Sequence, residues 1–228
     1  MLQKLISLND IFAQNESFGD EKNPHIFSCF EKKTFVCLCA PHATKTFVCK
    51  KIKQADLYTG AIVSYLSEFQ NFTSIVRNKF VKRKALISDF IERKHLNNHF
   101  FLDIHGMKNN DRFDLAVGTG YFQKEDYHQI LQIIDALAKK YHISYVINDE
   151  HYTGKFGLTG RLQKLEKKPC VLQLEFSKKY RDFFECSDNV CNVTIPFISE
   201  LSSAVEKLET SKSLSNSTST LSCLPFVP

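Results

Sequence analysis

The stretch FFLDIHGM at residues 100–107 decides how this chain is interpreted. Four of its first five residues are apolar, which is typical of a buried strand, and Asp103 and His105 lie near its end. Gly106 then predicts a turn away from the strand that leaves room for a ligand. Because open α/β sheets bind ligands just outside the carboxyl ends of their strands, the stretch indicates a candidate site at that end.

Strand-like and helix-like patterns alternate on both sides of this stretch. Besides residues 100–105, buried strands are expected at 34–39, 73–77, 113–117, 144–147 and 170–176. Helical apolar spacing covers 54–69 and 125–141, whereas the basic segment 78–98 is less regular. The alternation predicts a single α/β domain over residues 1–208, in three layers. Its mainly parallel or mixed sheet would carry helices on both faces.

The end of the chain has a different composition from the rest. Beyond Leu208 serine and threonine dominate, and residues 215–220 read SNSTST. Segments of this kind cannot bury enough apolar surface to offset the entropy lost on ordering. Residues 209–228 are therefore expected to form a solvated, disordered tail.

Composition and charge restrict the classes of function. With 43% hydrophobic and 24% charged residues the chain has an ordinary globular composition. The net charge of +5 is spread out, and the lysine clusters at 50–53 and 82–84 lack the interleaved aromatic residues of nucleic-acid-binding surfaces. A small basic excess favours an anionic substrate instead. No segment approaches the ~18 apolar residues of a membrane span, and no CxxC pair occurs. We expect a cytoplasmic protein that binds neither nucleic acid nor membranes.

Three predicted strand ends carry side chains that can do chemistry. His42 follows one buried strand and a proline, His105 lies near the end of a second, and Glu175 near the end of a third. If these strands are parallel neighbours, the three side chains converge at one edge of the sheet. Two imidazoles and a carboxylate are the ligand set of catalytic zinc, and a further carboxylate can activate the metal-bound water. Hydrogen-bonded structural histidines, with Glu175 paired to a buried cation, are the alternative.

A set of short motifs occurs in a fixed order over residues 35–184. They are PHAT at 41–44, KQADLYTG at 53–60, LDIHG at 102–106, RFDLAVGT at 112–119, Asn148 with YTG at 152–154, and LQLEFS at 172–177. In this order they resemble the N-formylglutamate amidohydrolase family. The resemblance implies a phosphorylase/hydrolase-like α/β core similar in fold to zinc carboxypeptidases. It also implies hydrolysis of the amide bond in a small N-acylated acidic amino acid.

The resemblance further implies roles for individual residues around one zinc ion. His42 and His105 would be ligands of the metal. The glutamate that carboxypeptidases place three positions after the first histidine is replaced here by Lys45. Asp56 is then the implied third ligand, because the family often places an aspartate on the helix that follows the first histidine. Glu175 occupies the position of the catalytic glutamate, which would deprotonate the bound water and later protonate the leaving amine.

Other polar residues are implied around the substrate. Arg112 would bind a substrate carboxylate or polarise the scissile carbonyl, although a solvent-facing loop position fits its surroundings equally well. Asp103 shares a strand face with His105 and would orient that imidazole through a hydrogen bond, or serve as a structural acceptor. Further candidates for substrate contacts are Arg161, Asn148 and Asp89.

The expected function is therefore zinc-dependent hydrolysis of a small anionic N-acyl amino acid. Two alternatives remain open. One is a related metallohydrolase that acts on a peptide, a poly-glutamate chain or a cell-wall fragment. The other is a non-catalytic family member that binds a ligand or partner through the same pocket. Retention of His42, His105 and Glu175 favours an enzyme, whereas Lys45 and the altered segment around Asp89 favour the non-catalytic protein.

Overall fold

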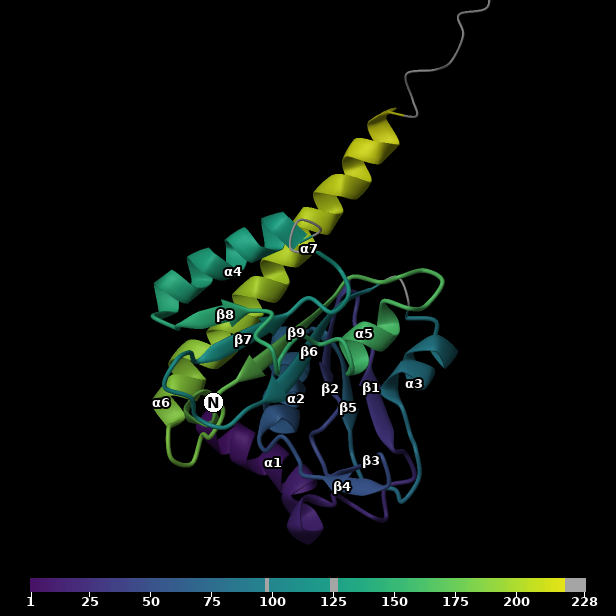
Figure 1. Ribbon diagram of the computed structural model, residues 1–228, viewed down its shortest axis with the longest axis vertical. Coiled ribbons are helices and arrows are strands. Elements are labelled where there is room, and N and C mark those ends of the chain that lie inside the picture. Colours follow the sequence, from purple (N-terminus) through teal and green to yellow (C-terminus); the bar gives the residue numbers. More distant parts are fainter. Residues whose placement is uncertain (97–98, 124–126, 220–228) are drawn as a thin grey trace, which may run out of the picture.

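The computed structural model describes residues 1–96, 99–123 and 127–219. Its centre is a seven-stranded sheet in the order β1-β5-β2-β6-β9-β7-β8 (Figure 1). The strands of this sheet are β1 (Phe27–Phe30), β2 (Val36–Ala40), β5 (Thr73–Arg77), β6 (Phe100–Gly106), β7 (Leu115–Gly118), β8 (Tyr145–Ile147) and β9 (Val171–Phe176). A separate antiparallel hairpin is formed by β3 (Thr46–Val48) and β4 (Lys51–Lys53).

The four central strands run in the same direction. β5 pairs parallel with β2, β2 with β6, and β6 with β9. On the flanks β1 is antiparallel to β5 and β7 is antiparallel to β9, while β8 is parallel to β7. The carboxyl ends of β5, β2, β6 and β9 therefore meet at one edge. This mixed, mainly parallel sheet confirms the predicted fold class.

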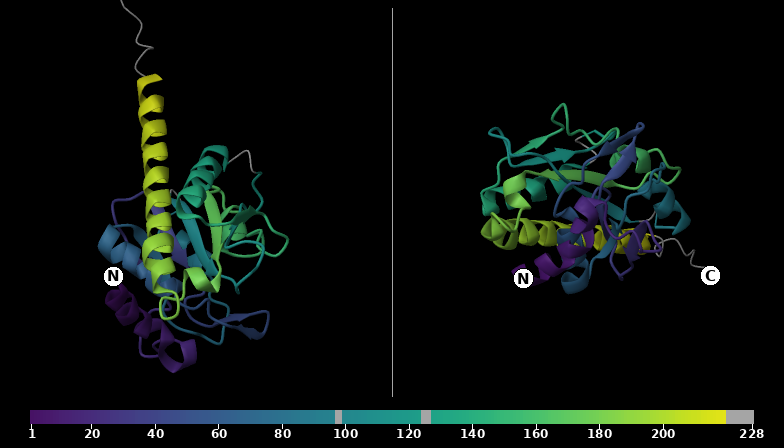
Figure 2. Two further views of the ribbon diagram at one scale, coloured as in Figure 1. Left: turned by 90° about the vertical axis from the view of Figure 1, so that its left-hand side faces the viewer. Right: turned by 90° about the horizontal axis from the view of Figure 1, so that it is seen from below.

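Helices cover both faces of the sheet and complete the three layers (Figure 2). One face carries α2 (Thr59–Gln70), α4 (His128–Tyr141) and α7 (Ile195–Ser219), with α1 (Leu2–Ser17) packed against α2. The opposite face carries the shorter helices α3 (Ile87–Arg93) and α5 (Leu158–Leu162). Short helical turns occur at η2 (Lys178–Tyr180), α6 (Ser187–Asn189) and η3 (Val190–Thr194).

The strands divide their side chains between two cores with a period of two residues. On β6, the residues packed in the core beneath α2 and α7 are Phe100, Leu102 and Ile104. Asp103 and His105 alternate with them and so face the side of α3 and α5. The register of β9 places Gln173 beside Asp103 and Glu175 beside His105. One face of this strand pair is thus apolar, and the other carries a row of polar side chains.

Several element boundaries differ from the sequence-based expectations. The strand at 73–77 has the predicted bounds. The helix expected from residue 54 begins at Thr59, because Tyr58 adopts a left-handed backbone conformation (φ 74°) that interrupts it. The irregular segment 78–98 contains α3, although residues 97–98 are outside the described ranges. Glu125, the expected first residue of the next helix, also lies outside the described residues, and α4 begins at His128.

Helix α7 (Ile195–Ser219) extends into the residues for which the sequence predicts a disordered tail. It continues past Leu208 to Ser219, and residues 220–228 lie outside the described ranges. Its first half buries apolar side chains, including Phe197 and Leu201. Once such a packed helix exists, each further turn adds hydrogen bonds without a new nucleation cost. Neither α7 nor any other described helix combines the length and the apolar character that crossing a membrane requires.

Candidate active site

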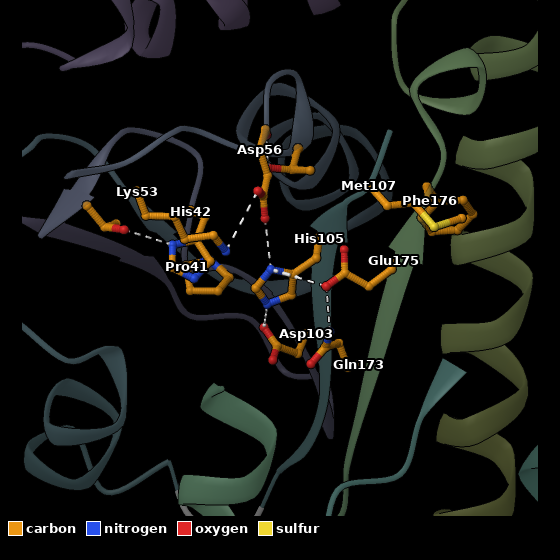
Figure 3. Close-up of polar contacts among 12 residues, drawn as sticks. Pro41, His42, Lys53, Asp56, Asp103, His105, Met107, Gln173, Glu175 and Phe176 are labelled. Carbon is orange, nitrogen blue, oxygen red and sulfur yellow. Dashed lines mark hydrogen bonds and ion pairs between the residues drawn. The ribbon is translucent and has the colours of Figure 1, made fainter. Parts of the chain in front are cut away.

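A buried polar cluster centred on His105 lies at the carboxyl ends of the parallel strands (Figure 3). The Nε2 atom of His105 lies 2.9 Å from Asp103 Oδ1, and its Nδ1 atom lies 2.8 Å from Asp56 Oδ2. Glu175 Oε1 is 4.0 Å from the same Nδ1 atom. All four side chains are buried. Asp56 reaches the cluster from the loop before α2, whereas the others come from β6 and β9.

Burial and the neighbouring charges shift the pKa values of His105 and Asp56 in opposite directions. Burial alone would lower the pKa of His105, but the neighbouring carboxylates of Asp103, Glu175 and Asp56 raise it well above its usual value. Burial also opposes ionisation of Asp56, yet its hydrogen bond to His105 and the neighbouring positive charges lower the pKa of Asp56 to about 2. At Glu175 burial prevails and raises the pKa. Glu175 is therefore better suited than Asp56 to accept a proton.

His42 contacts the cluster from the end of β2. Its ring centroid lies 5.1 Å from that of His105, and its Nδ1 atom lies 3.1 Å from Thr46 Oγ1 at the start of β3. Burial, together with the nearby charge of His105, lowers the pKa of His42 well below its usual value. The ring is therefore neutral at physiological pH, which is the form of histidine that binds metals.

Asp103 and Glu175 are held by further hydrogen bonds. The second carboxylate oxygen of Asp103 accepts a bond of 3.0 Å from Thr159 Oγ1 on α5. Gln173 lies two residues before Glu175 on the same face of β9, and its Nε2 atom donates to Glu175 Oε1 over 2.5 Å. Asp103 thus occupies the supporting position beside His105 that the sequence indicates, and α5 fixes its orientation.

Gly106 makes room for Arg181, and not for a ligand as the sequence suggests. It is the last residue of β6, and a Cβ atom built there would lie 2.3 Å from Arg181 Nε. The Arg181 guanidinium donates to the backbone carbonyls of Phe176, Leu57 and Met107, over 3.3, 2.6 and 3.0 Å respectively. Arg181 therefore ties the ends of β6 and β9 to the loop that carries Asp56.

A cavity of about 710 Å³ opens above the cluster. Its walls come from the β3–β4 hairpin, residues 83–87 and residues 153–158, and its floor includes His42, His105 and Glu175. The cationic side chains of the lining are Lys50, Lys53, Arg77, Arg83, Lys84, Lys155 and Arg161. Within the described part of the chain, Glu175 is the one acidic residue of this lining. Such a concentration of positive charge attracts anions.

Arg77 is a site residue that the sequence reasoning missed. It ends β5 and is 5% exposed. Its Nε atom donates to the Pro41 carbonyl over 3.0 Å, and its Nη2 atom donates to the Ala85 carbonyl over 2.7 Å. Burial lowers the pKa of Arg77 to about 10, so it remains a cation at neutral pH. Because the Arg77 charge is buried and its two hydrogen-bond acceptors are neutral carbonyl oxygens, an anion in the cavity would be attracted to it. The available signal was a charged residue at the end of the predicted strand 73–77, whose other residues are uncharged.

The two arginines that the sequence nominates have different positions. Arg161 lies on α5 and lines the cavity. Arg112 lies on a loop outside the cavity lining, with 68% of its side chain exposed, and its Nη2 atom is 3.2 Å from Asp149 Oδ2. The structure therefore does not bring Arg112 to the site, because its charge is engaged on the outer surface.

Asn148 and Asp89 also lie apart from the cluster. Asn148 accepts a bond of 2.9 Å from the Thr119 backbone and donates one of 2.9 Å to its hydroxyl, which joins the loop after β8 to the end of β7. Asp89 lies on α3 and lines a separate cavity of about 430 Å³ on the other side of residues 83–86. The predicted substrate contacts of these two residues therefore have no support in their placement.

The candidate metal ligands match zinc in type. No three His, Cys, Asp or Glu side chains of the described ranges are arranged as a metal site. His42, His105 and Asp56 nevertheless converge, and the Asp56–His105 hydrogen bond occupies the donor atoms that a metal would use. Two neutral imidazoles and one carboxylate suit zinc, provided that His105 gives up its Nδ1 proton. The zinc ion remains a prediction.

Comparisons with known proteins find similarity at the level of fold. No protein-family model matches the sequence, and no curated protein matches it either. The N-formylglutamate amidohydrolase from Ralstonia eutropha JMP134 has a TM-score of 0.54 and 10% identity, covering 80% of this chain and 97% of that one. A gene product from Agrobacterium tumefaciens has a TM-score of 0.55 and 12% identity, covering 84% and 99%. A bacteriophage poly-gamma-glutamate hydrolase has a TM-score of 0.48 and 14% identity, covering 84% and 92%.

These identities establish the fold and nothing finer. The resemblance to N-formylglutamate amidohydrolases that the ordered motifs indicate is confirmed at that level, because that enzyme's structure is matched over nearly its whole length. The α/β layers and the mainly parallel sheet agree with it. The chemistry of this chain has to be argued from its own residues.

Proposed function

We propose that this protein is a metal-dependent amidohydrolase that cleaves a small anionic N-acyl amino acid. The observation that carries the proposal is the group of His42, His105 and Glu175 at the floor of a cation-lined cavity, with the buried Asp56 in contact with His105. The fold likeness to N-formylglutamate amidohydrolase supports it. We also propose that the protein is located in the cytoplasm.

His42, Asp56 and His105 would hold the metal, for which zinc is the best match to two imidazoles and a carboxylate. When bound, zinc would polarise the scissile carbonyl and lower the pKa of a bound water. Asp103 binds the Nε2 side of His105, so the Nδ1 atom of that ring faces Asp56 and the cavity. This contact fixes the ring in the orientation that ligation through Nδ1 requires.

Glu175 is the proposed general base. Burial raises its pKa, which brings its proton affinity closer to that needed for proton transfer near neutral pH. Gln173 holds one of its oxygens, so the carboxylate has a defined orientation toward the cavity. Glu175 would take a proton from the attacking water and pass it to the leaving amine.

Arg77 is the proposed binding group for the substrate's anionic end, in the role that the sequence assigned to Arg112. It lines the cavity, its side chain is fixed by two carbonyl oxygens, and its charge is buried. A fixed guanidinium can bind a carboxylate with little further loss of side-chain entropy. Arg161 and Lys53 add positive charge to the same lining.

The test combines metal binding with turnover. The full chain is stripped of metal, titrated with zinc and assayed on N-formyl-L-glutamate and longer N-acyl glutamates. We expect close to one equivalent of zinc and zinc-dependent amide cleavage. His105→Ala should lose both, whereas His128→Ala, which changes an exposed histidine of α4 outside the cavity, should lose neither.

Two results would contradict the proposal. Unchanged zinc binding by His105→Ala would remove this cluster as the metal site. Stoichiometric zinc binding without turnover on any N-acyl amino acid would instead support a non-catalytic binding protein. The direct Asp56–His105 contact of 2.8 Å pairs two of the donors with each other, and it favours a non-catalytic protein that binds its ligand without a metal.

A further inference from the structure

The cavity above the cluster is much larger than a one-carbon acyl group requires. Its volume of about 710 Å³ lies in the range of ~300–1,000 Å³ that is typical of sites for drug-sized ligands. The charged groups of the lining are joined by large apolar side chains from three separate segments. These apolar residues are Phe47, Val48, Leu86, Ile87, Phe156 and Leu158. The lining is therefore amphiphilic.

Phe156 is the most unusual of these residues. It is 88% exposed, whereas the exposed rings of Phe69 and Phe184 each contact another aromatic ring. Among the described residues no aromatic ring contacts Phe156. It lies between Gly154 and Gly157, on a loop that forms one wall of the cavity. Together with the other apolar residues of this lining, Phe156 forms an apolar surface with charged groups around it, which is typical of a groove that a ligand covers.

The β3–β4 hairpin supplies a second apolar wall. It lies beyond the lower end of the sheet in Figure 1, and Phe47 and Val48 line the cavity from it. Its turn residues Cys49 and Lys50 both have positive φ values, of 49° and 63°, which is the geometry of a tight two-residue hairpin. Val48 is 41% exposed. The apolar surface of the hairpin is thus preformed and open to a ligand.

The charged and the apolar side chains of the lining lie at different depths in the cavity. Arg77 is buried, whereas Val48 and Phe156 are exposed. A ligand that places a carboxylate at Arg77 and extends toward the rim would bring its other end against these apolar side chains. Burial of apolar surface on both partners would then add to its affinity.

From this arrangement we propose that the cavity selects N-acyl amino acids with a bulky apolar acyl group, aromatic or long aliphatic, and that Phe156 determines this preference. The inference rests on the proposed hydrolase for the cleavage step, but not for the binding step. Formyl would be a poor acyl group for this protein, because it leaves the apolar rim uncovered.

The binding test uses N-dansyl-L-glutamate, a fluorescent probe whose sulfonamide is not an amide substrate. Titration of the zinc-supplemented full chain should show saturable binding. Phe156→Ser should weaken the affinity about tenfold, since burying one large apolar side chain is worth roughly one factor of ten or more. The control Phe30→Ser changes a ring that is 49% exposed on the edge strand β1, outside the cavity lining, and should change affinity less than about twofold.

A cleavage test separates this inference from the proposed function. The kcat/KM ratio of N-lauroyl-L-glutamate to N-formyl-L-glutamate should exceed one and fall about tenfold in Phe156→Ser. Probe binding that depends on Phe156, with no cleavage of either compound, supports the inference and contradicts the hydrolase. Cleavage with an unchanged ratio and unchanged probe affinity in Phe156→Ser overturns the inference alone. The inference is also overturned if poly-γ-glutamate binds more tightly than the probe and if its affinity is the same for the parent protein and for Phe156→Ser.

Discussion

The two faces of the β6–β9 strand pair are made from alternating residues of the same strands, yet they differ in character toward the carboxyl ends of these strands. One face carries six apolar side chains that are at most 1% exposed, namely Phe100, Leu102, Ile104, Leu172, Leu174 and Phe176. The other carries four buried polar side chains near its end, namely Asp103, His105, Gln173 and Glu175. The first face stabilises the fold through burial. The second costs desolvation energy and needs partners for every charge.

The comparison shows how a buried polar row can persist in a strand. Each carboxylate of the row has a hydrogen-bond partner, because Asp103 accepts from Thr159 and Glu175 accepts from Gln173. His105 has a carboxylate at each ring nitrogen. A buried network in which every group has a partner is compatible with a stable fold. However, apolar residues of similar volume in its place would often make a protein equally stable or more stable. We infer that the row is kept for chemistry and the opposite face for stability.

The largest effect is expected from changing the chemistry of the polar face without changing its shape. Glu175→Gln removes the proposed base and should lower kcat by about 10²–10⁴-fold on any substrate that the parent protein cleaves. The variant should remain folded, because burial disfavours the charge that the substitution removes. Turnover assays and urea unfolding measure the two. Full activity of the variant would exclude Glu175 as the base.

The apolar face should show the opposite behaviour. Leu102→Ala leaves a cavity at a side chain that is 0% exposed and should reduce the free energy of unfolding by about 2–5 kcal/mol. The kcat of the molecules that remain folded should stay close to that of the parent, because Leu102 points away from the site. Denaturant unfolding and activity below the transition test this. A loss of stability under about 1 kcal/mol would contradict the assigned packing.

Gly106, at the end of β6, provides a test of the contacts that Arg181 makes there. Gly106→Ala places a Cβ atom 2.3 Å from Arg181 Nε, so the guanidinium has to move and strain the carbonyl contacts that it makes. We expect a loss of about 1–3 kcal/mol in the free energy of unfolding. Gly157→Ala is the matched control, since its nearest neighbour atom is at 3.6 Å and it should be neutral or slightly stabilising. Equal stabilities of the two variants would refute the role of Arg181.

The predictability of the fold and the site has a clear physical limit. The apolar runs at 34–39, 100–105 and 170–176 are local signals, and the parallel-sheet rule then brings together the polar residues at or just after their ends. That argument correctly placed His42, His105 and Glu175 near one another. Asp56 joined them through the family resemblance, because no local pattern links it to a residue 49 positions away.

The misses concern residues whose environment is set by distant parts of the chain. Arg77 is buried because the carbonyls of Pro41 and Ala85 approach it, and its sequence neighbours carry no sign of either. Arg112 sits in a polar loop, and a loop sequence does not encode the direction in which a side chain points. Its pairing with Asp149 depends on how two loops meet. Local pattern therefore predicts strand ends better than it predicts substrate contacts.

The smallest effect is expected at an ion pair outside the cluster. Asp114 accepts bonds of 3.1 and 2.8 Å from the backbone and hydroxyl of Ser144, and Lys179 Nζ lies 2.6 Å from it. Burial opposes its ionisation, yet these contacts with Lys179 and Ser144 lower the pKa of Asp114. A lowered pKa means that the ionised form stabilises the fold above the unfolded-state pKa of about 3.9, and that this contribution is lost as the pH falls through the lowered value.

Asp114→Asn should therefore be less stable than the parent at pH 7, by at most about 1 kcal/mol, because Lys179 is half exposed and solvent screens the pair. The difference in the free energy of unfolding should shrink steadily below about pH 4, where the parent loses the same charge. Urea unfolding of both proteins from pH 7 to pH 3 measures it, with the exposed change Asp111→Asn as the control. A constant difference across this range would mean that the Asp114 charge contributes nothing. Asp114 would then contribute only through its hydrogen bonds to Ser144, which an asparagine oxygen can also accept.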